Sequence, residues 1–392
     1  MTPAARVQAA IELLDEIIAA ARDAAAAADT LIARYFKERR YAGSKDRRAV
    51  RELIYAAIRR CGNRPVSGRA ALLGLVQDRP ELAAQFDGSA HGPAPIAADE
   101  AVAPAALLPD WIVPRLAGII GPEEHAALLE RATLDIRVNR LKADVATILP
   151  QLEGAEPIPG FADALRLPEG TAVEGCPQWE AGLIEVQDAG SQLISASAQA
   201  RPGMTVIDLC AGAGGKTLAM AAGMGGKGRI VACDTSRPRL QRLPERAARA
   251  GVTVETLLLN PNKEAEALAP LRGQADVVLV DAPCSGTGTW RRNPEARWRL
   301  TPERLGKLVA EQARILDFAA PLVKPGGRLV FAVCALTDAE GKGQVEAFLA
   351  RHGGWQVEPM AASVGRAWGA GRLLSPAHDG TDGFFMAAMV KA

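Results

Sequence analysis

The sequence predicts an α/β fold built on a doubly wound parallel sheet, preceded by an all-helical region and a small α+β subdomain. Two observations carry this prediction. After residue 176, short runs rich in Val, Ile and Leu alternate with helical segments, which is typical of a parallel sheet covered by helices. One of these runs ends in a glycine-rich loop that leads into a helix, and ligands bind at that edge of such sheets.

The chain is long enough for two or three domains, each with its own core. Its 392 residues are 48% apolar and 23% charged, as in ordinary globular proteins. We expect a helical domain at residues 1–86, a linker rich in Gly, Pro and Ala at 87–106, the α+β subdomain at 107–175 and the α/β domain at 176–392.

The first region is predicted to be helical and basic. Apolar residues at helical spacing indicate helices around Val7–Ile18 and Leu31–Phe36, and a third helix that Ser44 caps and Gly62 ends. Residues 31–64 contain 11 Lys or Arg against 3 Asp or Glu, an excess of eight. A solvated helical face is the alternative, but this excess favours a surface that binds phosphates.

The α+β subdomain shows both helical and strand patterns. Helical spacing covers Pro109–Ile120, Glu123–Ala132 and Ala143–Leu152. Asp135–Lys142 is predicted to be a strand, with Pro- and Gly-rich turns following it.

In the α/β domain the alternation defines the elements and the edge where ligands bind. The predicted strands are Thr205–Leu209, Arg229–Asp234, Val254–Leu259, Ala275–Asp281 and Gly327–Cys334. The predicted helices are Asp188–Arg201, Thr217–Met224, Pro238–Ala250, Thr301–Leu322 and Gly341–His352. Because ligands bind at the carboxyl ends of parallel strands, the candidate site residues are those at the strand ends: Asp208–Gly215, Asp234, Asn260, Asp281–Cys284 and Cys334.

The loop in Val206–Thr217 (VIDLCAGAGGKT) is the strongest cofactor candidate. Its glycines allow a ligand to approach the backbone, and the helix start offers unpaired N–H groups. Asp234, about 20 residues further on, is placed to bind ribose hydroxyls. The loop is neither GxGxxG nor a phosphate loop, so a dinucleotide is disfavoured. A glycine-rich turn without a cofactor is the alternative.

The cysteines indicate both the compartment and the chemistry. The six cysteines form no CxxC pair and there are only four histidines, so we expect a reducing, cytoplasmic environment and no metal site. We also expect no membrane partner, since no apolar run of about 18 residues is present. Cys284 and Cys334 end neighbouring strands and could meet over one substrate; the alternative for each is a small buried apolar residue.

A thiol at the cofactor edge suits methylation of cytosine. Carbon 5 of cytosine is a poor nucleophile, but thiolate attack on carbon 6 makes carbon 5 enamine-like, so that it can accept a methyl group. Asp281 is placed to donate or share a proton at the ring N3. Which cysteine attacks stays open at this point.

Five segments together resemble the RNA cytosine-5-methyltransferases of the Nop/Sun (Fmu) family, over roughly residues 108–392. The segments are EVQDAGSQL (Glu185–Leu193), DLCAGAGGKT (Asp208–Thr217), DAPCSGTGTWRRNPEARW (Asp281–Trp298), KPGGRLVFAVCAL (Lys324–Leu336) and DGTDGFF (Asp379–Phe385). The N-terminal SKDRRAVRELIYAAIRR is similar to the NusB-like RNA-binding domain of the bacterial ribosomal RNA member.

The resemblance implies a Rossmann-like methyltransferase domain that binds S-adenosylmethionine. It implies Cys334 as the nucleophile and Cys284 as the residue that assists product release. It also places Asp234 on the ribose, Asn260 near the adenine, and Asp281 near the methionine end or the base. The loop residues it assigns to the cofactor are Cys210, Ala211, Gly212, Ala213, Gly214, Gly215 and Lys216.

Departures from the family pattern lie beside the reacting groups. Val333 and Ala335 flank Cys334 where the family usually has Thr and Ser, and Gly212-Ala213 replaces Ala-Pro. The acidic segment after the nucleophile is also altered, at Glu340–Lys342. None of these changes removes a reacting atom.

We therefore expect a monomeric S-adenosylmethionine-dependent RNA cytosine-5-methyltransferase acting on 16S ribosomal RNA. The alternatives are a transfer RNA methylase of the same family, a non-catalytic RNA-binding assembly factor and, least favoured, an NAD-dependent enzyme. Thr289–Arg299, with two tryptophans and four arginines, is predicted to stack on and bind single-stranded RNA. A structural loop with inward-facing tryptophans is the alternative.

Overall fold

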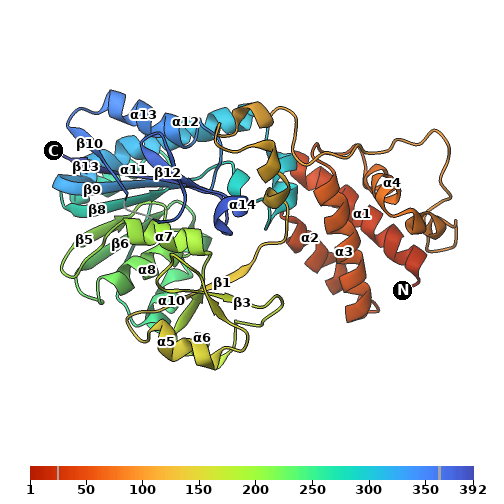
Figure 1. The fold of residues 1–392 in the computed structure, drawn as a ribbon, viewed down its shortest axis with the longest axis horizontal. Helices are drawn as coiled ribbons and strands as arrows, with labels where there is room; N and C mark the ends of the chain where they lie inside the picture. Colours follow the sequence, from red (N-terminus) through yellow and green to blue (C-terminus); the bar gives the residue numbers. More distant parts are fainter. Residues whose placement is uncertain (24–25, 361–362) are drawn as a thin grey trace. The chain divides into compact units, whose positions relative to one another are not determined.

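The computed structural model describes residues 1–23, 26–360 and 363–392 of the chain and divides into two compact units (Figure 1). The helical unit comprises Met1–Leu116, Gly121–Glu130 and Thr289–Arg304. The sheet unit comprises Ala117–Ile120, Arg131–Gly288 and Leu305–Ala392. These units differ from the predicted domains, because residues 107–116 and 121–130 lie with the helices and the α+β part lies in the same unit as the large sheet.

The helical unit is built on four helices. They are α1 (Pro3–Arg22), α2 (Ala28–Glu38), α3 (Ser44–Arg60) and α4 (Gly68–Asp78). Apolar residues at the predicted spacing form its core, among them Leu14, Ile32 and Ile54. Ser44 does not cap α3: the cap is Gly43, whose N–H donates to the Asp46 carboxylate, so Ser44 is the first helical residue.

Residues 87–106 contain no helix or strand, as their composition predicts, but they lie against the helices. The Ala103 N–H donates to the Ala70 carbonyl at 3.0 Å and the Ala106 N–H to the Arg60 carbonyl at 2.9 Å. Arg69 pairs with Glu100. The segment is therefore a part of the helical unit.

The helices predicted between residues 109 and 132 are only short 3₁₀ turns. The structure has Val113–Arg115, Pro122–Glu124 and Ala126–Leu128 there. Prolines at the starts of two of these turns and glycines between them interrupt the helical hydrogen bonds, which the spacing of apolar residues alone does not reveal.

A small antiparallel sheet precedes the large one within the sheet unit. Its order is β2-β3-β1-β4, and it carries two short helices. The bounds are β1 (Leu134–Val138), α5 (Val145–Ile148), β2 (Glu156–Pro157), β3 (Ala164–Leu167), α6 (Pro177–Glu180) and β4 (Ile184–Val186). Because β4 pairs with β1, this sheet extends past the predicted boundary at residue 175.

The large sheet has the predicted doubly wound centre. Along its main path the order is β11-β12-β13-β9-β8-β5-β6-β7, and β10 pairs with β13. Strands β7, β6, β5, β8 and β9 are parallel. From β5 the chain adds β6 and β7 on one side, and it then returns to add β8 and β9 on the other side of β5. Ligands bind at such a change in strand order. The bounds are β5 (Thr205–Asp208), β6 (Arg229–Asp234), β7 (Glu255–Leu258), β8 (Ala275–Asp281), β9 (Val323–Val333), β10 (Trp355–Glu358), β11 (Arg366–Trp368), β12 (Gly371–Leu374) and β13 (Phe384–Lys391).

Helices cover both faces of this sheet (Figure 1). Val278 and Val280 of β8 pack in a core with α12 and α13, whereas Val277 and Leu279 pack in a second core with α7 and α8. This alternation along a strand is what a sheet buried on both faces requires. The helices are α7 (Ala189–Ser197), α8 (Gly215–Gly223), α9 (Arg237–Leu240), α10 (Leu243–Ala250), α11 (Glu264–Leu268), α12 (Pro302–Ala319), α13 (Lys342–Arg351) and α14 (Pro376–Asp379).

Both tryptophans of the tryptophan- and arginine-rich segment are buried, which corrects the prediction that they stack on RNA. Trp290 and Trp298 are 0% and 3% exposed and Arg297 is 1% exposed. The Trp298 Nε1–H and the Arg297 guanidinium both donate to the Cys61 carbonyl at the end of α3, at 2.8 and 3.0 Å. The Trp298 ring packs in the core of the helical unit, and the inward-packing alternative is the correct one.

Candidate active site

The glycine loop joins β5 to α8 in the conformation that a cofactor cradle needs. Gly214 caps α8 with a φ of 87°, and a Cβ there would lie 2.1 Å from Leu243 Cδ1, so only glycine fits. The first N–H groups of an α-helix have no carbonyl partner within the helix, so the start of α8 can bind an anionic group of a ligand. Burial raises the pKa of Asp208 to about 7, and its carboxyl accepts a 2.6 Å hydrogen bond from the Thr217 hydroxyl, which ties the end of β5 to α8.

Asp234 ends β6 beside this loop. Its carboxylate accepts hydrogen bonds from the Gly212 N–H at 2.7 Å and the Ser236 N–H at 2.6 Å, and its side chain lines the cavity described next. The two backbone contacts fix the carboxylate while leaving lone pairs for a ligand.

A cavity of about 450 Å³ lies at the carboxyl ends of the strands, a size typical of small-molecule sites. Eight of the predicted strand-end residues line it: Leu209, Cys210, Asp234, Asp281, Ala282, Pro283, Cys284 and Cys334. The loop residues from Ala211 to Lys216, which the resemblance assigns to the cofactor, are not among its lining residues. The structure does not bring Asn260 into the cavity: Asn260 is exposed, and its neighbour Leu259 lines the wall instead.

Some of the residues that line the cavity were not predicted from the sequence. Arg314 of α12 pairs with Glu264 at 3.0 Å, and both line the cavity beside Phe318. No motif marks these positions, since a pair 50 residues apart has no signature in one sequence. Glu340, which binds Ser285 beside Cys284, stands out in the sequence only as part of an altered acidic segment, with no role assigned to it.

Lys216 and Asp281 form an ion pair at 2.6 Å, between the start of α8 and the end of β8. Burial disfavours the charged form of Lys216, but the Asp281 carboxylate outweighs burial and raises the pKa of Lys216. The lysine is therefore an ammonium group beside a carboxylate that lines the cavity.

The two candidate cysteines are in contact, with their sulfur atoms 3.2 Å apart. The hydrogen bond to Cys334 and burial raise the pKa of the Cys284 thiol well above its usual value. The contact joins the two thiols at the cavity wall, where one can donate a hydrogen bond to the other.

The unusual neighbours of Cys334 face the apolar core. Val333 and Ala335 are both 0% exposed and pack in the core that contains α12 and α13, whereas Cys334 packs against the core on the other face. Their side chains point away from the thiol side, because neighbouring residues in extended chain face opposite ways.

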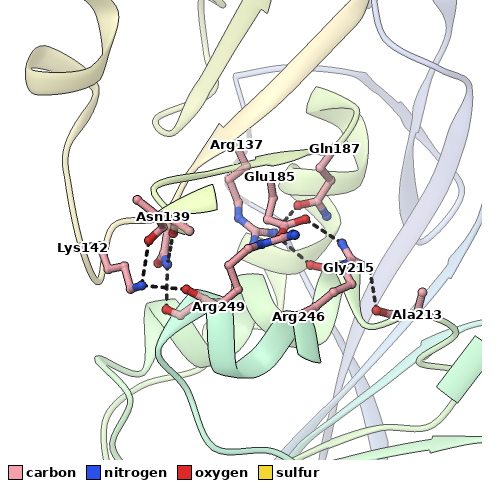
Figure 2. Close-up of polar contacts among 12 residues, drawn as sticks. Arg137, Asn139, Lys142, Glu185, Gln187, Ala213, Gly215, Arg246 and Arg249 are labelled. Atoms are coloured by element: carbon pink, nitrogen blue, oxygen red, sulfur yellow. Dashed lines mark hydrogen bonds and ion pairs between the residues drawn. The ribbon is translucent and has the colours of Figure 1, made fainter. Parts of the chain in front are cut away.

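Two arginines connect the small sheet to the glycine loop, and a third pairs with the same sheet (Figure 2). Arg137 of β1 donates to the Gly215 carbonyl at 2.9 Å and to the Gln187 side chain. Arg246 of α10 donates to the Ala213 carbonyl at 2.5 Å, and Glu185 of β4 pairs with both Arg246 and Arg249. These contacts hold two carbonyls of the cofactor loop and so fix its conformation.

Comparison with known proteins connects this geometry to a family. The family model described as 16S rRNA methyltransferase RsmB/F matches residues 197–390. The chain is 35% identical over 298 residues to the probable ribosomal RNA small subunit methyltransferase B of Synechocystis sp., which covers 72% of this chain and 67% of that protein. The ribosomal RNA small subunit methyltransferase B of Xanthomonas campestris is 34% identical over 300 residues, with 74% and 68% covered.

The chain belongs to the RsmB/F methyltransferase family. It is an S-adenosylmethionine-dependent RNA methyltransferase. The crystal structure of PH0851 has the same fold, with a TM-score of 0.77 and 23% identity over 98% of this chain and 99% of that one. The predicted family, fold class and cofactor are thus confirmed. No helix within the described residues is long and apolar enough to cross a membrane.

Proposed function

We propose that this protein transfers a methyl group from S-adenosylmethionine to carbon 5 of a cytidine in small-subunit ribosomal RNA, through a covalent adduct on Cys334. The observation that carries the proposal is the contact between Cys284 and Cys334 at the cavity wall. Two thiols in contact can supply a nucleophile and a proton donor in one pair; we assign the first role to Cys334 and the second to Cys284.

The cavity suits S-adenosylmethionine. Asp234 lines the cavity and is suited to accept from the ribose hydroxyl groups, and we assign the N–H groups at the start of α8 to the methionine end. Leu259, Ile315 and Phe318 give one wall the apolar character that an adenine ring requires. When bound, the cofactor supplies an electrophilic methyl group on a sulfonium.

The first step is attack by the Cys334 sulfur on carbon 6 of the cytosine. A C–S bond forms, and the electron pair of the 5,6 double bond becomes available at carbon 5 for the methyl group. Charge that develops at the ring N3 is met by the Asp281–Lys216 pair, which can share a proton with it.

Product release reverses the attack. Carbon 5 loses its proton to water, the electron pair restores the 5,6 double bond, and the C–S bond breaks to return the thiolate of Cys334. Cys284 donates to the departing sulfur across the same 3.2 Å contact. This donation assists the breakdown of the adduct.

The substrate assignment rests on the relatives and on the charge of the helical unit. The two relatives described above are named as ribosomal RNA small subunit methyltransferases. Lys37, Arg40, Lys45 and Arg48 are exposed on or beside α2 and α3, where they can contact RNA phosphates.

The test is to trap the adduct. Cys284→Ala should accumulate an RNA–protein adduct that survives denaturation, because attack proceeds and release loses its proton donor. Cys334→Ala should give neither adduct nor methylated product, although it should still bind S-adenosylmethionine. Adduct in Cys334→Ala, or its absence from Cys284→Ala with product still formed, contradicts the mechanism.

A further inference from the structure

Glu340 is a completely buried carboxylate in the segment that follows Cys334. Its Oε1 accepts from the Ser285 N–H at 2.7 Å and from the Gln312 side-chain amide at 3.1 Å. Its Oε2 accepts from the Ser285 hydroxyl at 2.5 Å and the Thr337 hydroxyl at 2.8 Å. All four acceptor positions are used, and all four donors are neutral.

A buried carboxylate among neutral donors is costly for the fold. Transfer of a charge from water is favourable only when its hydrogen bonds are nearly ideal, and an apolar side chain would fill the space at lower cost. The arrangement around Glu340 therefore calls for an explanation in terms of what the carboxylate holds in place.

What it holds is the loop that carries Cys284. Ser285 directly follows this cysteine, and Gln312 also donates to the carbonyl of Pro283, which directly precedes it, at 2.9 Å. The peptide groups on both sides of Cys284 are thus fixed by Glu340 or by its partner Gln312. Cys334 depends less on Glu340, because strand β9 leads directly into it and its carbonyl accepts from the Gly288 N–H at 3.1 Å.

We propose that Glu340 is a positioning residue for product release: it holds the thiol of Cys284 against Cys334 so that the adduct can break down. This inference rests on the proposed covalent mechanism. Glu340 is thereby assigned to product release, which is the step that needs Cys284. The attack by Cys334 does not require the Cys284 loop to be in place.

Loss of the Glu340 carboxylate should affect product release and leave cofactor binding unchanged. Glu340→Ala frees the Cys284 loop, so the variant should accumulate the covalent RNA adduct even though both cysteines are present. Turnover should fall about 100-fold, which is the order of loss for a reacting group displaced by about 1 Å. The affinity for S-adenosylmethionine should not change, since Glu340 does not line the cavity.

Glu340→Gln separates the hydrogen bonds from the charge. Its carbonyl can accept from the Ser285 N–H and Gln312, and its NH₂ can donate to the hydroxyls of Ser285 and Thr337, which rotate to accept. This variant should therefore release product without visible adduct. Glu346→Ala, which removes an exposed carboxylate of α13, is the control for general effects of losing a charge.

The experiment incubates each variant with S-adenosylmethionine and unmodified ribosomal RNA, then resolves the denatured products on a gel beside Cys284→Ala. Adduct in Glu340→Ala and Cys284→Ala, with little in Glu340→Gln, is the expected result. The double variant Glu340→Ala/Cys284→Ala should yield no more adduct than Cys284→Ala, because both changes remove the same step.

The outcomes separate the two proposals. Adduct in Cys284→Ala but none in Glu340→Ala overturns the role of Glu340 and leaves the covalent mechanism standing. No adduct in any variant overturns the covalent mechanism and the role of Glu340 with it. If Glu340→Ala fails to fold, Ser285→Ala, which deletes one of the four donors, provides the test: it should accumulate adduct at lower yield, and normal release by it overturns the inference.

Discussion

The helical unit contains two arginine-rich stretches that look alike in sequence and differ in structure. The first includes Arg40, Lys45 and Arg48 of the α2–α3 region, whose side chains are exposed. The second is Thr289–Arg299, where Arg297 is 1% exposed and donates to the carbonyls of Ile58 and Cys61. The first is available to a nucleic acid, whereas the second is part of the core.

The difference shows what arginine can do besides binding phosphate. The last carbonyls of a helix have no partner within it, and a buried guanidinium with its planar set of donors can satisfy several at once. Arg297 does this at the end of α3. A count of positive charges therefore cannot separate an RNA surface from a buried helix cap, but burial and partners can.

The largest effect that separates the two stretches is expected from Trp298→Ala. Removing this buried ring and its hydrogen bond to Cys61 should lower the free energy of unfolding of the helical unit by about 3 to 5 kcal/mol, measured by urea denaturation. Arg292→Ala, an exposed position in the same segment, should have a much smaller effect. Weaker RNA binding by Trp298→Ala at unchanged stability contradicts this account and restores the stacking function.

Arg137 extends the comparison to a buried arginine in the sheet unit. Arg137→Met releases the Gly215 carbonyl of the cofactor loop and should weaken S-adenosylmethionine binding about tenfold, as expected for the loss of a charged hydrogen bond. Isothermal titration calorimetry measures this directly. Arg140→Met is the matched control, because the Arg140 side chain is 51% exposed and contacts no part of the loop. Equal affinities in the two variants count against a role for Arg137 in cofactor binding.

The smallest effect on the fold is expected at the exposed stretch. Lys45 and Arg48 lie three residues apart on one face of α3, so both can contact one phosphate backbone. The double change to Gln should leave stability within about 0.5 kcal/mol and reduce the slope of log K for RNA against log salt by roughly one per residue.

The control for this change is Lys227→Gln/Arg272→Gln. Both residues are exposed and precede strands β6 and β8, at the edge of the sheet opposite the cavity. If the control pair weakens RNA binding as much as the α3 pair does, the α3 surface has no special part in binding.

Elements with a regular pattern were predicted well from the sequence. The bounds of β6 and β8 agree with their predicted ranges, because runs buried on both faces are apolar throughout and end sharply at an aspartate. The strand-end rule then brought Asp234, Cys284 and Cys334 to one cavity. The contact between the two sulfurs follows from β8 and β9 being neighbours in the sheet.

The remaining features depend on which way a side chain points or on contacts between distant segments. Asn260 follows β7 by two residues, so Leu259 faces the cavity and Asn260 faces solvent. Glu340 has no spacing signature, since its partners Ser285 and Gln312 are 55 and 28 residues away. Thr289–Arg299 was misassigned because tryptophan and arginine are equally suited to RNA contact and to burial.

The most direct test of the central claim follows the methyl group. The purified protein is incubated with methyl-labelled S-adenosylmethionine and unmodified small-subunit ribosomal RNA, and the digested nucleosides are compared between wild type and Cys334→Ala. The account predicts label in 5-methylcytidine for the wild type and none for the variant. Label in a different nucleoside, or equal label in both proteins, would contradict it.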